Sequence, residues 1–369
     1  MSEALPARLN AGLSPGARLR ALLAGPLLFP ALFLILGIVA IAAMAVGGAG
    51  IPLHRIPAAL GLAHPVDLAI SERDRLVLLS VRLPRIAIAI IIGAMLASSG
   101  AIMQGLFRNP LADPALVGVS SGGALAAASS AASSIVIGDR MTASTAPLPF
   151  AVLPLAAFCG SLITTAILQR LATRGRTTSI AIFLLAGLAI AALANAGIGL
   201  LVFVADDRQL RDITFWLLGS LGGATWEKVS LIAPFLLAML AAVPFIGRGL
   251  DLLVLGEAEA FHMGIAVERL KRIAIVLIAA MTGAAVAFAG VVGFVGIVVP
   301  HLLRIVIGPG HRKLLPASAI LGATLLLAAD TAARTIAAPA EVPIGVLTAL
   351  VGAPFFLVLL LRQRGLAGL

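Results

Sequence analysis

The sequence predicts an all-α, polytopic membrane protein with ten transmembrane helices. Of its 369 residues, 61% are apolar and only 11% are charged, whereas a soluble domain is about 45–50% apolar and about 25% charged. The mean hydropathy of +1.13 reflects apolar residues gathered into long runs, and a run of about 20 residues is enough to cross a bilayer. The chain has too few charges to cover a water-facing surface, which excludes an ordinary soluble protein.

The ten predicted spans are separated by short polar or glycine-rich segments. They occupy residues 26–49, 84–107, 114–137, 147–169, 178–205, 229–247, 272–289, 292–307, 315–335 and 343–361. We interpret the first as a retained span, because its apolar run is about twice as long as the core of a signal peptide and further spans follow. No polar stretch is long enough for a second domain, so residues 1–369 are predicted to form a single transmembrane domain.

The basic residues predict the orientation. With the N-terminus inside, sixteen Arg and Lys residues fall on the cytoplasmic side and ten on the outer side, which agrees in direction with the positive-inside rule. Both termini are then cytoplasmic, and residues 1–25 form an N-terminal tail. The net charge of +10 comes from arginines between the spans, so it indicates topology and surface docking rather than nucleic-acid binding. The lone Cys159 excludes disulfides and cysteine-based metal clusters.

The connection between the second and third spans, residues 103–125, reads MQGLFRNPLADPALVGVSSGGAL. It breaks the helix twice, at Asn109-Pro110 and Asp113-Pro114, because the residue before a proline disfavours helical backbone. This sequence resembles the matching segment of the iron-complex, haem and cobalamin permease family (FecCD type) of binding-protein-dependent ABC importers. The resemblance covers residues 80–362, including VAFAGVVGFVGIVVPHLLRIVIGPGHRKLLP and ILGATLLLAADTAARTIAAPAEVPIGVLTALVGAP.

The resemblance implies a cobalamin-importer-like (type II) permease with ten helices per subunit. It also implies a homodimer of this chain in the lipid bilayer of a bacterial inner membrane. Two cytoplasmic ABC ATPase subunits and a periplasmic binding protein are the implied partners. Within the family, the chain is most similar to the haem-uptake permeases, so the implied binding protein carries haem.

The largest polar insertion on the predicted inside is residues 250–272, LDLLVLGEAEAFHMGIAVERLKR. Glu257, Ala258 and Glu259 begin a short amphipathic helix, and Gly264 breaks it. The resemblance implies that this segment is the cytoplasmic coupling loop, whose helix docks in a groove of the ATPase. A solvated loop helix with no partner is the alternative.

The chain lacks the motifs of an enzyme. Its three lysines lie outside any phosphate-binding loop of the form G-x-x-x-x-G-K-[ST], so ATP and magnesium are expected to be used by the partner ATPase. We expect no cofactor or metal bound by this chain. Asp330 is the only acid well inside a predicted span, and Arg334 lies one helical turn away as its expected ion-pair partner.

Two features favour haem as the transported substrate. In residues 204–223, Asp206-Asp207 followed by QLRDITFW resembles the haem-uptake branch, the alternative being an interfacial segment with Trp216 in the aromatic belt. His301 and His311 are candidate haem ligands, because neutral imidazole binds iron. Their motifs also occur in relatives that carry cobalamin or siderophores, so packing and hydrogen-bonding roles stay open.

The translocation pathway is expected along the axis of the homodimer. The resemblance places the fifth helix beside this axis, with an inner constriction near its cytoplasmic start. Thr177, Thr178 and Ser179 stand at that start as small hydroxyl residues and are the candidate gate. Ordinary capping of the helix N-terminus is the alternative.

Three of the arginines on the predicted outer side are candidates for docking the binding protein. Arg82 and Arg85, in VRLPR, stand at the mouth of the second span, and Arg334 stands at the end of the ninth. The resemblance implies that they meet glutamates of the periplasmic binding protein, where opposite charges give orientation and speed of association. Anchoring to lipid headgroups is the alternative.

Together these features predict the permease subunit of an ABC importer that moves haem from the periplasm to the cytoplasm by alternating access. Within the same family, import of a ferric siderophore or of cobalamin is the alternative. From another class, the alternative is a secondary transporter or channel, which would need inverted repeats or ion-coupling acids.

Overall fold

The computed structural model describes residues 25–47, 50–62, 68–115, 118–141, 149–175 and 177–366. Within these ranges the chain is helical apart from its connections and one hairpin, β1 (Thr173–Arg174) and β2 (Thr177–Thr178), which confirms the all-α prediction. The predicted N-terminal tail lies outside the described residues except for its last residue.

The long helices fall on the predicted spans. In chain order they are α3 (Leu28–Ala45), α6 (Leu83–Phe107), α7 (Val119–Met141), α8 (Pro149–Ala172), α9 (Ile180–Val204), α11 (Trp226–Leu253), α13 (Val267–Ala289), α14 (Val295–Ile307), α15 (His311–Ile336) and α16 (Ile344–Leu366). Shorter elements connect them: η1 (Leu53–Arg55), α4 (Ile56–Ala59), α5 (Leu68–Leu76), η2 (Val77–Arg82), α10 (Asp207–Leu218) and α12 (Glu257–His262).

Seven helices among the described residues are long and apolar enough to cross a membrane. α14, with 13 residues, and the apolar part of α16, Ile344–Val358, are shorter. The boundary between the seventh and eighth predicted spans is sharp, because Gly290 ends α13 with a φ of 69° and Phe294 precedes α14 with a φ of 67°. Because α14 and the apolar part of α16 are shorter than the other spans, ten crossings remain a prediction.

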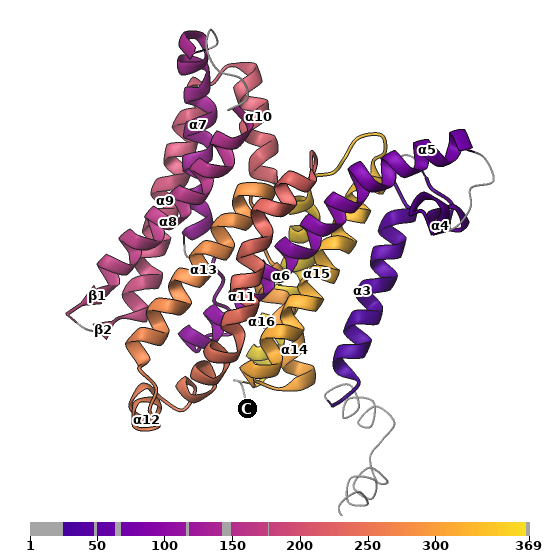
Figure 1. The fold of residues 1–369 in the computed structure, drawn as a ribbon. Helices are drawn as coiled ribbons and strands as arrows, with labels where there is room; N and C mark the ends of the chain where they lie inside the picture. The colour runs from indigo at the N-terminus through magenta and orange to yellow at the C-terminus, as the bar shows by residue number, and fades with distance from the viewer. Residues whose placement is uncertain are drawn as a thin grey trace, which may run out of the picture.

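α6 lies at the centre of the bundle, where α11, α13, α14 and α15 pack around it and α3 packs mainly on α15 (Figure 1). Glycines allow this close packing. A Cβ atom on Gly100 would lie 2.0 Å from the carbonyl oxygen of Gly296 on α14, and one on Gly93 would lie 2.3 Å from that of Gly322 on α15. In a membrane, where packing drives helix association, small residues at such crossings let the backbones meet.

α7, α8 and α9 form the second part of the bundle and pack against one another (Figure 1). α13 contacts both α6 and α8, so it joins the two parts. The hairpin β1–β2 connects α8 to α9 and lies at the same end of the bundle as α12, whereas α4, α5 and α10 lie at the opposite end (Figure 1). We call these the α12 end and the α10 end.

The connection after α6 has the two predicted breaks. Arg108 ends α6 in the left-handed conformation, with a φ of 48°. The Asn109 side chain accepts a hydrogen bond from the Leu111 amide at 2.9 Å, and the Asp113 side chain accepts one from the Ala115 amide at 3.1 Å. Each acidic or amide side chain thus closes a turn of its own, which turns the chain back toward α7.

Candidate functional site

α12 is a short, sharply bounded helix. Gly256 precedes it with a φ of 127°, and Gly264 follows it with a φ of 87°. The Ile265 amide donates to the Ala260 carbonyl at 3.0 Å, and the Gly264 amide donates to the Phe261 carbonyl at 2.9 Å, the pattern of a Schellman motif. Glycine adopts such left-handed backbone without steric cost, so the predicted helix break at Gly264 is present.

Large apolar side chains around α12 are exposed. Phe261 is 67% exposed, Leu255 61% and Met263 47%, while Ala260 is fully buried and holds α12 against the bundle. An exposed apolar patch on a polar segment marks a surface for a protein partner. Sequence analysis singled out Glu257, Ala258, Glu259 and Gly264 but not these apolar residues, although Phe261 and Met263 within a polar insertion were the available signal.

The three predicted coupling residues on α12 point in different directions. Ala258 and Glu259 are exposed. Glu257 turns back toward the bundle, where its Oε2 lies 2.8 Å from the Nζ of Lys271 on α13. The first two therefore lie on the exposed surface of α12, whereas Glu257 ties α12 to α13.

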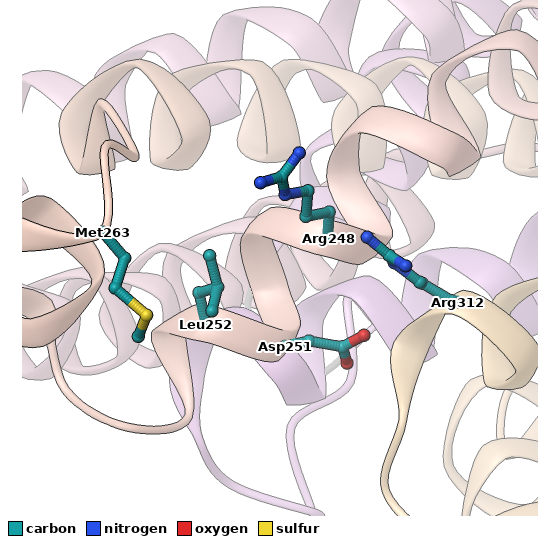
Figure 2. Close-up of a pocket in the computed structure, with 5 residues that line it drawn as sticks. All are labelled: Arg248, Asp251, Leu252, Met263 and Arg312. Atoms are coloured by element: carbon teal, nitrogen blue, oxygen red, sulfur yellow. The ribbon is translucent and has the colours of Figure 1, made fainter.

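A pocket of 520 Å³ opens beside α12, lined by Arg248, Asp251, Leu252, Met263 and Arg312. Figure 2 shows the two arginines on one side of the pocket and Met263 on the other. The Asp251 carboxylate is engaged, because its Oδ1 accepts from the amide of His311 at 2.6 Å and lies 3.0 Å from Nδ1 of the same residue. The guanidinium groups give the pocket a net positive character.

The candidate gate residues lie in the hairpin that precedes α9. Ser179 is the N-cap of α9, and its Oγ accepts from the Ile182 amide at 3.4 Å, so its capping role is present. Thr177 is exposed and donates to the Arg174 carbonyl. Thr178 is buried and its Oγ1 donates to Glu268 of α13 at 3.1 Å. Thr178 thus links the hairpin to α13.

The two candidate histidines have separate surroundings. His311, at the start of α15, is buried between Asp251 and Gly105, where a Cβ atom on Gly105 would lie 2.4 Å from its Nε2. The ring of His301, on α14, meets that of Phe355 on α16 at 6.2 Å between centroids. Nε2 of His311 and Nδ1 of His301 are buried and have no hydrogen-bond partner in the described part of the chain.

The three predicted docking arginines come together with two carboxylates at the α10 end of α6 and α15. Arg85 Nε donates to both carboxylate oxygens of Asp330, at 3.0 and 3.1 Å. Its Nη1 and Nη2 bind the two oxygens of Glu341 at 2.8 and 2.9 Å. The predicted pair within α15 is also present, with Arg334 Nε 3.2 Å from Asp330.

This charged cluster is largely buried. Arg82 is 4% exposed, Arg85 8% and Asp330 1%, and the side chain of Glu341, in the connection to α16, is 44% exposed. Arg82 also donates to the Met44 carbonyl. The Arg85 guanidinium lowers the pKa of Glu341 below its ordinary value. Glu341, the exposed carboxylate of the cluster, was missed by sequence analysis, because it follows Arg85 by 256 positions.

The segment that resembled the haem-uptake branch forms α10. Asp206 caps it by accepting from the Arg208 and Gln209 amides, and the Asp206 amide donates in turn to Oε1 of Gln209, which completes a capping box. Trp216 is half-buried and packs on the apolar cluster that includes Ala127 and Ala157. α10 thus packs on the neighbouring ends of α7 and α8.

Comparison with known proteins gives the family. A model of the FecCD transport family matches residues 33–362. The hemin transport system permease protein HmuU of Yersinia pestis is 46% identical over 294 residues, 78% of this chain and 83% of that protein. The cobalamin import system permease protein BtuC of Halobacterium salinarum is 41% identical, over 83% of this chain and 78% of that protein.

Two further comparisons extend this picture. The Fe(3+) dicitrate transport system permease protein FecD of Escherichia coli is 39% identical, over 78% of this chain and 86% of that protein. A solved structure described as "an inward-facing conformation of a putative metal-chelate type ABC transporter" has a TM-score of 0.76 and 32% identity. It covers 90% of this chain and 98% of its own.

Proposed function

We propose haem as the cargo of this chain, which belongs to the FecCD transport family. Its relatives are permease subunits of ABC importers, so it is a multi-pass membrane permease of that class and not catalytic by itself. Family membership decides against a secondary transporter or channel. The energy for transport comes from an ATPase partner, and this chain supplies the pathway.

The observation that carries the choice of haem is the 46% identity with a hemin permease. The identity with the cobalamin permease of Halobacterium salinarum is 41%, and that with the ferric dicitrate permease is 39%. The α10 segment, Asp206-Asp207 followed by QLRDITFW, supports the same choice. Cobalamin and ferric chelates are the alternatives within the family.

Transport by the purified complex tests this choice. Proteoliposomes that contain the permease and its ATPase, with haem-loaded binding protein outside and ATP inside, should accumulate haem. A parallel set without ATP is the control. If the same vesicles accumulate cobalamin or a ferric siderophore and ignore haem, the choice of substrate is wrong.

The surface around α12 is the proposed docking site of the ATPase, which makes the α12 end cytoplasmic. Its exposed Phe261, Leu255 and Met263 offer apolar contact, and the arginines of the adjacent pocket suit an acidic partner side chain. In the proposed assembly two copies of this chain and two ATPases lie together in the inner membrane. The apolar surface of α9, on which Leu185 is 68% and Leu193 71% exposed, then faces lipid or the second copy.

The charged cluster at the α10 end is the proposed docking site of the periplasmic binding protein. Reversing Arg82 and Arg85 to glutamate would also disrupt the buried ion pairs, so a milder change is the better test. Glu341→Gln removes the exposed carboxylate that occupies Arg85. If Arg85 receives carboxylates of the binding protein, association should become faster, and high salt should reduce the gain. An association rate equal to the wild type at low salt would mean that these arginines do not dock the partner.

Haem ligation by His301 and His311 is proposed from their unpartnered ring nitrogens. The double variant His301→Ala/His311→Ala should lower haem uptake, while His54→Ala, at an exposed position in η1, should not. Absorption spectra of haem added to each purified variant give a second readout. Unchanged uptake and spectra in the double variant would remove both histidines from the pathway.

A further inference from the structure

Lys271 is a buried charged residue at the beginning of α13. It is only 2% exposed, and lysine is almost never buried to this extent unless it is paired. Its Nζ lies 2.8 Å from Glu257 Oε2 on α12 and 2.9 Å from Glu268 Oε1 on α13, and it donates to the Thr178 carbonyl of β2 at 3.4 Å. An ammonium group has three donors, and here three acceptors from three elements receive them.

The carboxylate of Glu268 provides a second link between this cluster and the hairpin. While Oε1 faces Lys271, Oε2 accepts a hydrogen bond from Thr178 Oγ1 at 3.1 Å. Thr178 Oγ1 also lies 3.2 Å from Thr173 Oγ1 across the hairpin, and Ser179, the next residue, caps α9. One polar cluster therefore joins the surface helix α12 to the first turn of α9.

We propose that Lys271 is the positioning residue that transmits the displacement of α12 to the beginning of α9. The proposal rests on the proposed function, in which the ATPase docks at α12, and on the inner constriction that sequence analysis predicts near the start of α9. Apolar contacts at this site would allow α12 to slide over α13. Lys271 opposes such sliding, because it is buried and moving Glu257 away would leave its ammonium group less compensated in a poorly solvated place. Glu257 itself is half-exposed, with 42% of its side chain accessible, so the penalty falls on the lysine.

The cluster also gives the motion a direction. Glu257 is the first residue of α12, so a movement of α12 acts on Lys271 at the point where α12 begins. Lys271 passes it to the Thr178 carbonyl, and Glu268 passes it to the Thr178 hydroxyl. The backbone and side chain of a single residue before α9 are thus held from the same side, which favours movement of the hairpin together with α12.

The test is the coupling between ATP hydrolysis and transport in proteoliposomes that contain the permease, its ATPase and haem-loaded binding protein. Lys271→Met keeps the apolar stem and removes the ammonium group. It should lower haem uptake per ATP hydrolysed by about tenfold, while hydrolysis without binding protein, which takes place in the partner subunit, continues. Lys271→Arg, which keeps the charge, should restore most of the uptake.

Arg272→Met is the matched control, since Arg272 is the neighbouring cation on α13 but is exposed and donates to the carbonyl of Glu268 in its own helix. It should behave as the wild type. Wild-type uptake per ATP in Lys271→Met would overturn the proposal. A parallel loss of complex recovery, basal hydrolysis and uptake, with no rescue by Lys271→Arg, would also overturn it by showing a purely structural role.

Thr178→Val provides an independent variant that leaves Lys271 and its ion pairs in place. It removes only the hydroxyl bonds to Glu268 and Thr173 and should also lower uptake per ATP. Unchanged uptake would contradict transmission through this cluster. If the wild type itself moves no haem, the proposed substrate fails, and Lys271 is then judged by the ratio of ATP hydrolysis with and without binding protein.

Discussion

Asp330 should be a major contributor to stability among the charged residues at the α10 end, and Asp330→Asn tests this. Asp330 is 1% exposed and lies within 3.2 Å of both Arg85 and Arg334. Removing one member of a buried ion pair costs about 3–5 kcal/mol. Arg85 keeps its two contacts with Glu341 in the variant, so we expect a loss at the lower end, about 3 kcal/mol.

Two variants give the scale for this loss. Glu341→Gln removes a carboxylate whose side chain is 44% exposed, so solvent screening limits its cost to about 1 kcal/mol. Asp212→Asn, at an exposed position on α10, should cost less than about 0.5 kcal/mol. Unfolding in mixed micelles, followed by circular dichroism, gives the free energies. The reasoning is refuted if Asp330→Asn matches Asp212→Asn, or if Glu341→Gln costs more than Asp330→Asn.

Three further predictions follow from glycine geometry and from the pKa of Glu341. Gly264→Trp should abolish transport and stimulated ATP hydrolysis but leave the bundle folded, because a Cβ atom there meets nothing within 4 Å. The control is Gly61→Trp at the α10 end, where φ is similar and a Cβ atom also meets nothing within 4 Å; this variant should still transport. Gly100→Val should lower the yield of folded protein severely, since its Cβ would lie 2.0 Å from a carbonyl oxygen, whereas Gly199→Val on α9, with open space, should fold. Arg85 lowers the pKa of Glu341, so the ionised carboxylate contributes to stability above its ordinary pKa of 4.5. This contribution is lost as the pH falls through the lower pKa of the folded protein. Between about pH 6 and pH 3, the unfolding temperature should therefore fall more steeply for the wild type than for Glu341→Gln.

The parts of the fold that depend on local sequence were predictable. Each predicted span falls on a helix, because hydropathy over about 20 neighbouring residues decides whether a segment enters the membrane. The glycine break after α12 and the Asp330–Arg334 pair are also local, since each depends on residues within two turns. Whether α14, with 13 residues, crosses the membrane depends on its neighbours, and hydropathy does not decide it.

The links between distant residues could not be predicted from one sequence. Lys271 reaches Thr178 across 93 positions, and nothing in the local pattern of α13 indicates which carbonyl its ammonium group meets. Sequence analysis gave α12 and the start of α9 separate roles, in coupling and in gating. The contacts of Lys271 and Glu268 place those two segments in one polar cluster, which is why the coupling hypothesis now has a specific residue to test.

The charged cluster also changes the interpretation of the basic residues. Sequence analysis assigned ten Arg and Lys residues to the outer side against sixteen inside, which is a modest bias. Arg82, Arg85 and Arg334 are three of those ten, and they lie within η2, α6 and α15 as largely buried residues. The positive-inside rule concerns residues in loops. Setting aside the largely buried residues on both sides, these three and Lys271 of α13, leaves seven against fifteen, so the bias that supports a cytoplasmic α12 end is stronger than the sequence count indicated, with or without a docked binding protein.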